Sequence, residues 1–212
     1  VRDTAYFFAE MEKSFSNPKL AKIGLIEHAS KRKLRIGLVT QSITGTVDQE
    51  TTETLYQTAQ LLEGLGHHIT EYKLPISTRF VDDFSHYWGM LAFMLQHLGK
   101  QAFGQGFDAK ELDHLTLGLS NLYKNNFYKT PAFLYRLKKV QTDYMNIFNH
   151  YDVLLSPVVA HTTPKLGYLS PQLPFDELFE RIQNFVTFTP IQNIAGAPAM
   201  SIPMGITQID GL

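Results

Sequence analysis

Short apolar runs alternate with amphipathic stretches along the chain, and this alternation predicts an α/β fold. Continuous apolar runs lie near 35–40, 67–74, 152–160 and 199–204, and such runs are typical of strands that are buried on both faces. Between them, apolar residues recur every three or four positions, as they do on the buried side of a helix. We therefore expect one mixed, largely parallel sheet that is flanked by helices on both faces.

The segment 35–74 predicts a strand, a helix and a second strand. Thr46 and Gln49 have the spacing of a capping box, the leucines that follow share one face, and Gly66 suits the end of the helix. Because strand, helix and strand follow one another within about forty residues, we expect the two strands to be parallel, with a right-handed connection.

Further helices are expected on both sides of this unit. They are predicted from Asp3 to before Asn17, over 20–29, from Thr130 onward, over 176–188 and over 190–195. The helix that begins at Thr130 has one apolar face, which consists of Phe133, Leu137, Val140, Tyr144 and Ile147. Thr189 and Pro190 suit the start of the last helix, and Gly196 suits its left-handed end. Residues 77–128 break the alternation, and we expect an irregular, aromatic-rich helical insertion there, with Trp88 at its centre.

Composition excludes several classes of function. The chain has 212 residues and a net charge of −1, with Lys plus Arg at 19 against Asp plus Glu at 20, so we expect no nucleic-acid partner. It has no cysteine, which excludes thiol catalysis and thiolate metal sites and agrees with a cytoplasmic location. No apolar run approaches the roughly 20 residues that span a bilayer, and the first residues do not resemble a signal peptide, so we expect no membrane partner.

Candidate chemistry is sparse. The eight histidines show no metal-ligand spacing, and His67 and His68 would point to opposite faces of a strand, so we expect no metal site and no cofactor. Asp152, Ser156 and His161 have the atoms of a hydrolase triad. They lie in or just beyond one strand, however, and nothing near them supplies an oxyanion hole, so we interpret this combination as coincidence.

Four segments resemble the amidase signature family, in the order in which that family carries them. Thr189, Pro190, Asn193, Gly196, Pro198, Ser201 and Pro203 are similar to a pattern near its C-terminal end. Asp152-Val-Leu-Leu-Ser-Pro157 resembles its Asp-x-Leu-Leu-Thr-Pro strand, Arg35-Ile-Gly resembles its Arg-Ile-Gly strand, and Val1, Asp3 and Ala5 resemble the helix after its catalytic loop.

This resemblance implies amide hydrolysis by a lysine, a serine in a cis peptide and a nucleophilic serine, beside a Gly-Gly-Ser stretch. None of those motifs occurs in the sequence. We therefore expect residues 1–212 to be a single C-terminal fragment of an amidase domain, part of an α/β/α sandwich, with no catalytic residue and no activity alone. The implied substrate is a small-molecule amide, and Trp88, Thr162 and Phe188 are the expected substrate-binding residues. A fragment of a sheet also favours self-association into a homo-oligomer.

A different class of function stays open at this point. The same residues could form a non-catalytic α/β module that binds a small ligand or a partner. The coding sequence upstream of Val1 distinguishes the two hypotheses, because an amidase requires a Gly/Ser-rich segment with a preceding lysine there.

Overall fold

A three-stranded parallel sheet organises most of the chain in the computed structural model, which describes residues 2–208. Its strands are β1 (Arg35–Leu38), β2 (His68–Glu71) and β3 (Val153–Leu155), in the order β2-β1-β3. Arg35 pairs with His68 on one side of β1, and Ile36 pairs with Val153 on the other. The expected parallel pairing of the strands in segment 35–74 is confirmed.

The helices account for most of the remaining regular structure. They are α1 (Arg2–Ser14), α2 (Gln49–Gly64), α3 (Arg79–Phe103), α4 (His114–Lys124), α5 (Thr130–Asn146), α6 (Phe175–Phe185) and α7 (Pro190–Ala195), with short 3₁₀ helices η1 (Ala109–Glu111), η2 (Phe127–Lys129) and η3 (Ile147–Asn149). The chain divides into two units, Val1–Lys33 with α1 and Leu34–Leu212 with the other elements. Within residues 2–208, no helix is long and apolar enough to cross a membrane.

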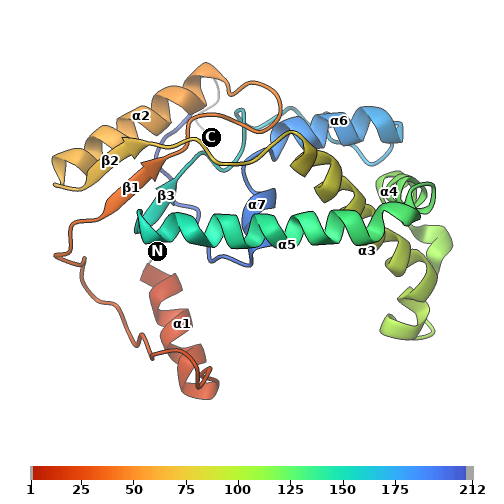
Figure 1. The fold of residues 1–212 in the computed structure, drawn as a ribbon, viewed down its shortest axis with the longest axis horizontal. Coiled ribbons are helices and arrows are strands. Elements are labelled where there is room, and N and C mark those ends of the chain that lie inside the picture. Colours follow the sequence, from red (N-terminus) through yellow and green to blue (C-terminus); the bar gives the residue numbers. More distant parts are fainter. Residues whose placement is uncertain (1, 209–212) are drawn as a thin grey trace. The chain divides into compact units, whose positions relative to one another are not determined.

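Helices cover both faces of the sheet, as the apolar runs predicted. On one face, Leu55 and Ala59 of α2 pack with Leu38 of β1. On the other, the core contains buried side chains of α3, α5, η3 and α7, and Leu154 of β3 packs against it. The buried residues of this core are Phe80, Phe133, Leu137, Tyr144, Ile147, Ile191 and Ala195. Figure 1 shows α2 and α5 on opposite sides of the strands, which confirms the α/β class.

The aromatic-rich region 77–128 is more regular than expected, because most of it forms α3 and α4. A side chain at Gly89 of α3 would place its Cβ 2.7 Å from the carbonyl oxygen of Leu119 in α4. Since a backbone oxygen cannot move aside cheaply, glycine is what lets these two helices pack so closely.

The caps of two helices differ from the prediction. Asp48, not Thr46, begins α2, because its Oδ1 accepts the backbone N–H of Thr51 at 2.7 Å. Gly66 follows the helix with a φ of +88°, as expected. Thr189 precedes α7 with helical backbone angles, and its hydroxyl donates to the carbonyl of Val186. It therefore does not cap the helix, although Pro190–Ala195 is helical and Gly196 ends it at a φ of +65°.

Two predicted elements are wrong. Residues 20–29 form no helix, because the carboxylate of Glu12 accepts the backbone N–H groups of Ile23 (2.8 Å) and Gly24 (2.7 Å), and Gly24 has a φ of +69°. Residues 199–204 form no strand and are exposed, since none of the three described strands lies beside them to pair with their backbone. The strands predicted over 67–74 and 152–160 are real but short, and β2 is largely exposed at the edge of the sheet.

Candidate functional site

A cavity lies where α3 and α6 meet the loop after β1. It encloses about 400 Å³, its open mouth included. Its lining is Phe80, Val81, Phe84, Ser85 and Trp88 from α3, Phe179, Ile182 and Gln183 from α6, and Ile43, Thr44, Val186, Thr187 and Pro190 from the connecting segments. None of these side chains is ionisable, so the cavity favours a neutral, mainly apolar group.

Three aromatic rings form one side of the cavity. The ring centroid of Trp88 lies 6.2 Å from that of Phe84 and 6.1 Å from that of Phe179. Phe84 precedes Trp88 by one helical turn, so both side chains lie on one face of α3. Phe179 comes from α6. The ring of Trp88 is tilted by 45° against that of Phe84 and by 50° against that of Phe179, so the three rings form an angled apolar wall that can contact aromatic or aliphatic groups.

Two threonines fix the loop after β1 against α6. The Oγ1 of Thr187 accepts the backbone N–H groups of Ile43 (3.1 Å) and Thr44 (2.9 Å). The Oγ1 of Thr44 in turn donates to the backbone carbonyl of Gln183 at 2.9 Å. Thr187 is buried and its partners are partly buried, so leaving the Oγ1 of Thr187 unpaired would be costly, and these bonds hold the loop beside the cavity.

Ser85 and Gln183 supply the polar side chains between α3 and α6. The hydroxyl of Ser85 donates to the carbonyl of Val81 at 2.7 Å. The amide Nε2 of Gln183 donates to the Oγ of Ser85 at 3.1 Å. This chain of hydrogen bonds positions the amide of Gln183 at the cavity lining.

Asp48 joins the loops that follow β1 and β3. Its Oδ2 accepts the backbone N–H of Thr162 at 2.8 Å, while its Oδ1 caps α2. Burial raises the pKa of Asp48, but the hydrogen bonds from Thr51 and Thr162 outweigh burial and hold that pKa below its ordinary value. The carboxyl ends of neighbouring parallel strands, where ligands of α/β proteins usually bind, are thereby tied together.

The structure brings only one of the three predicted substrate-binding residues to the cavity. Trp88 lines it, whereas Thr162 and Phe188 are not among its lining residues. Thr162 lies at the carboxyl end of the sheet beside Asp48, and Phe188 is buried with 3% of its surface exposed. A substrate-binding role for these three residues stays a prediction.

Phe84, Phe179 and Gln183 line the cavity but were not predicted as site residues. The signal was present, because Phe84 and Trp88 are four positions apart, and Phe179 and Gln183 repeat the same spacing on α6. Helical spacing alone does not distinguish a cavity from a packed core, however, so it could not have assigned them to a site.

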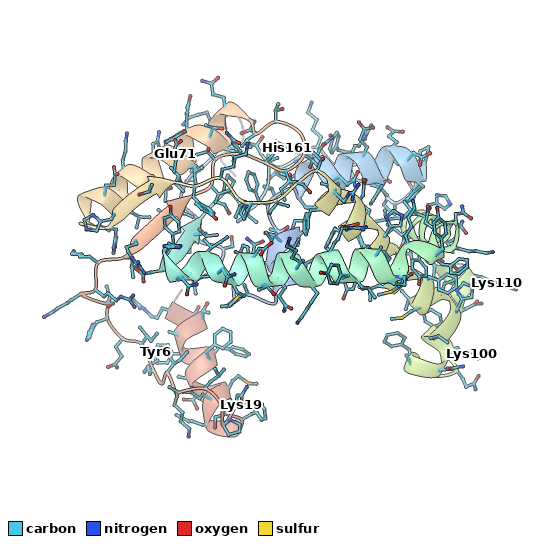
Figure 2. The ribbon with its side chains drawn as sticks, in the orientation of Figure 1. Tyr6, Lys19, Glu71, Lys100, Lys110 and His161 are labelled. Atoms are coloured by element: carbon cyan, nitrogen blue, oxygen red, sulfur yellow. The ribbon has the colours of Figure 1, made fainter. Side chains whose placement is uncertain are left out.

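The rejected triad residues have separate partners in the structure. The carboxylate of Asp152 accepts the backbone N–H of Arg35 at 2.8 Å, and the hydroxyl of Ser156 donates to the carbonyl of Pro157. His161 hydrogen-bonds through Nδ1 to the carbonyl of Thr162, and its ring centroid is 4.7 Å from that of Phe185. Figure 2 places His161 where the loop near α2 approaches α6. These contacts are those of three separate structural roles.

The family comparison and similar curated proteins both point to amidases. A family model described as Amidase matches residues 1–212. The chain is 40% identical over 205 residues to the Mycobacterium leprae (strain TN) protein named "Putative amidase AmiC", covering 96% of this chain and 44% of that protein. It is 28% identical over 206 residues to a glutamyl-tRNA(Gln) amidotransferase component from Bdellovibrio bacteriovorus, covering 85% of this chain and 40% of that protein.

Solved structures share the fold. One is a 6-aminohexanoate cyclic dimer hydrolase complexed with substrate, with a TM-score of 0.67 and 17% identity over 86% of this chain and 40% of that one. Another is a bacterial aryl acylamidase of the amidase signature family, with a TM-score of 0.59 and 20% identity over 85% of this chain and 38% of that one. The chain spans less than half the length of each of these four proteins.

Proposed function

Because the chain belongs to the amidase family over residues 1–212, we propose that it forms the C-terminal part of an enzyme that hydrolyses carbon–nitrogen amide bonds. In this proposal the chain supplies part of the sheet and one side of the substrate pocket. The observation that carries the pocket assignment is the cavity between α3 and α6, which is lined by Trp88 and Phe179 and by no ionisable side chain.

The reacting groups belong elsewhere in this proposal. Acyl transfer needs an activated nucleophile, a base within hydrogen-bond reach and donors aimed at the developing oxyanion. The hydroxyl of Ser42 lies within hydrogen-bonding distance of the backbone carbonyls of Thr44 and Gly45, and that of Ser156 donates to the carbonyl of Pro157, so neither is paired with a base. We propose that the serine, cis-serine and lysine of the amidase signature lie in a longer polypeptide, before the sequence of this chain.

The substrate we propose is a small neutral amide whose apolar part enters the cavity. A charged group would lose its hydration there without meeting an opposite charge among the lining residues. The proposed location is the cytoplasm, which the absence of cysteine supports.

The test compares the 212-residue chain with the longer polypeptide on a panel of aliphatic and aromatic amides, with a serine-directed fluorophosphonate as an independent probe. We expect turnover and labelling by the longer polypeptide, and neither by the chain alone. Labelling of a serine within the chain would contradict the assignment of the nucleophile. A longer polypeptide that hydrolyses none of the amides would instead favour the non-catalytic binding module.

A further inference from the structure

The hydrogen bonds around Gln183 leave one side-chain acceptor of the cavity without a donor. The hydroxyl of Ser85 has a single hydrogen, which it gives to the carbonyl of Val81 at 2.7 Å. Ser85 can therefore only accept from Gln183, so the amide of Gln183 must face it with Nε2, at 3.1 Å. The Oε1 of Gln183 then faces away from Ser85, and no residue within 2–208 donates to it.

The other side-chain oxygens of the cavity already have donors or are donors themselves. The Oγ1 of Thr187 accepts two backbone N–H groups, and Thr44 is engaged with Thr187 and with the backbone of Gln183. Among the described side chains, the buried polar atom without a partner is the Nε2 of His86. The Oε1 of Gln183 is therefore open to water, and a bound donor takes the place of that water. This gives the cavity one preferred kind of polar partner.

We propose that Gln183 is a specificity-determining residue whose Oε1 accepts a hydrogen bond from the substrate. The class of group that fits is an uncharged ring or branched alkyl group that carries one hydrogen-bond donor, such as a hydroxyl or an N–H, and stacks against Trp88 and Phe179. The role of Gln183 as an acceptor depends on the cavity alone, whereas the statement that the bound group belongs to an amide substrate rests on the proposed function.

The cavity should distinguish ligands that have a hydrogen-bond donor from ligands of similar shape that have none. A ligand with the same ring but no donor still gains contact with the aromatic side of the cavity, while leaving the Oε1 of Gln183 unpaired. Because a net hydrogen bond of this kind changes affinity by about fivefold to tenfold, the ratio of the two affinities measures the contribution of Gln183 separately from ring burial.

The experiment measures ligand binding by the chain, independently of any hydrolysis. Trp88 is the single tryptophan of the sequence and lines the cavity, so its fluorescence reports occupancy. Cyclohexanol, which has a donor, is titrated against methoxycyclohexane, which has none. We expect the unmodified chain to bind cyclohexanol about fivefold to tenfold more tightly than methoxycyclohexane. Gln183→Met should lose this preference and keep its affinity for methoxycyclohexane. Gln60→Met, which replaces an exposed glutamine of α2, is the control and should keep the preference.

Equal binding of the two ligands, no binding of either, or a preference that survives in Gln183→Met would overturn the assignment. Circular dichroism of each variant shows whether the fold is retained. Ser85→Ala is a second variant, because it releases the amide of Gln183 to rotate and should reduce the preference without removing it. If the longer polypeptide shows this binding preference but hydrolyses no amide, the proposed function is refuted and the binding site is retained.

Discussion

Arg136 of α5 holds the carboxylate of Asp83 of α3 through two hydrogen bonds, with Nε to Oδ2 at 2.7 Å and Nη2 to Oδ1 at 2.6 Å. Asp83 is only 5% exposed, so water cannot replace the guanidinium. Since α3 carries Trp88 and α5 packs against the sheet, this ion pair fixes one side of the cavity to the core.

Arg136→Met should lower the free energy of unfolding by about 2 kcal/mol, because it leaves the buried carboxylate of Asp83 without its partner. Urea denaturation followed by circular dichroism measures the change. The control is Lys138→Met on the same helix, which removes an exposed hydrogen bond to Gln141 and should cost less than about 0.5 kcal/mol. Equal effects of the two variants would mean that the ion pair does not hold α3 to α5.

Asp48→Asn should lower the free energy of unfolding by about 1 to 2 kcal/mol at neutral pH. An asparagine can still accept from Thr51, but its amide nitrogen cannot accept the N–H of Thr162. Because the folded-state pKa of Asp48 is lowered, its stabilisation is present above the unfolded pKa of about 3.9 and is lost as the pH falls through the folded pKa. Denaturation curves between about pH 7 and about pH 3 should therefore show the two proteins converging in acid.

Asp113→Asn is the matched control for that series. Asp113 also caps a helix, α4, but both of its oxygens bond within the first turn, to the N–H and the hydroxyl of Thr116. Asparagine is about as good a cap as aspartate, so this variant should lose less stability at neutral pH. If Asp113→Asn were as costly as Asp48→Asn, the bond to Thr162 would not be the source of the difference.

Gly89→Ala should destabilise the protein by about 1 to 3 kcal/mol, because its Cβ would lie 2.7 Å from the carbonyl oxygen of Leu119. Gly64→Ala, in the last turn of α2, has no atom within 4 Å of the added Cβ and should stabilise by up to about 1 kcal/mol. Thermal unfolding of the two variants measures both. Stabilisation by both substitutions would show that helix propensity outweighs the packing of α3 on α4.

Trp88→Ala in the longer polypeptide should change the ratio of kcat/KM between an aromatic and an aliphatic amide by about tenfold, because the ring contributes apolar contact area to the cavity. Tyr135→Ala, which removes a ring that is 75% exposed on α5, is the control and should leave the ratio unchanged. Unchanged kinetics in a fully folded Trp88→Ala protein would remove Trp88 from the substrate site.

The purified chain should self-associate, because apolar side chains alternate along the exposed segment 200–206 and the outer edges of β2 and β3 have no neighbouring strand among the described residues. Light scattering over a range of concentrations measures the effect. Met200→Ser with Ile202→Ser should shift the chain toward monomer, whereas Ser201→Ala should not. A stable monomer at high concentration would contradict the prediction.

Helices, whose backbone hydrogen bonds are internal, could be predicted from local sequence patterns. The face of Phe133, Leu137 and Tyr144 predicted α5, and Pro190 with Gly196 predicted both ends of α7, because helical spacing and fixed backbone angles are local properties. The apolar run at 35–40 predicted the central strand for a related reason, since a strand buried on both faces needs apolar residues at every position.

Whether an apolar run becomes a strand, and where a cavity forms, depends on contacts between distant parts of the chain. Residues 199–204 have the composition of a strand but no strand beside them, and strand hydrogen bonds can form only with a neighbour. The cavity joins Ser85 to Gln183, two residues that are 98 positions apart. No local pattern contains that contact, because it depends on how α3 and α6 pack, and packing is set by side chains from the whole core.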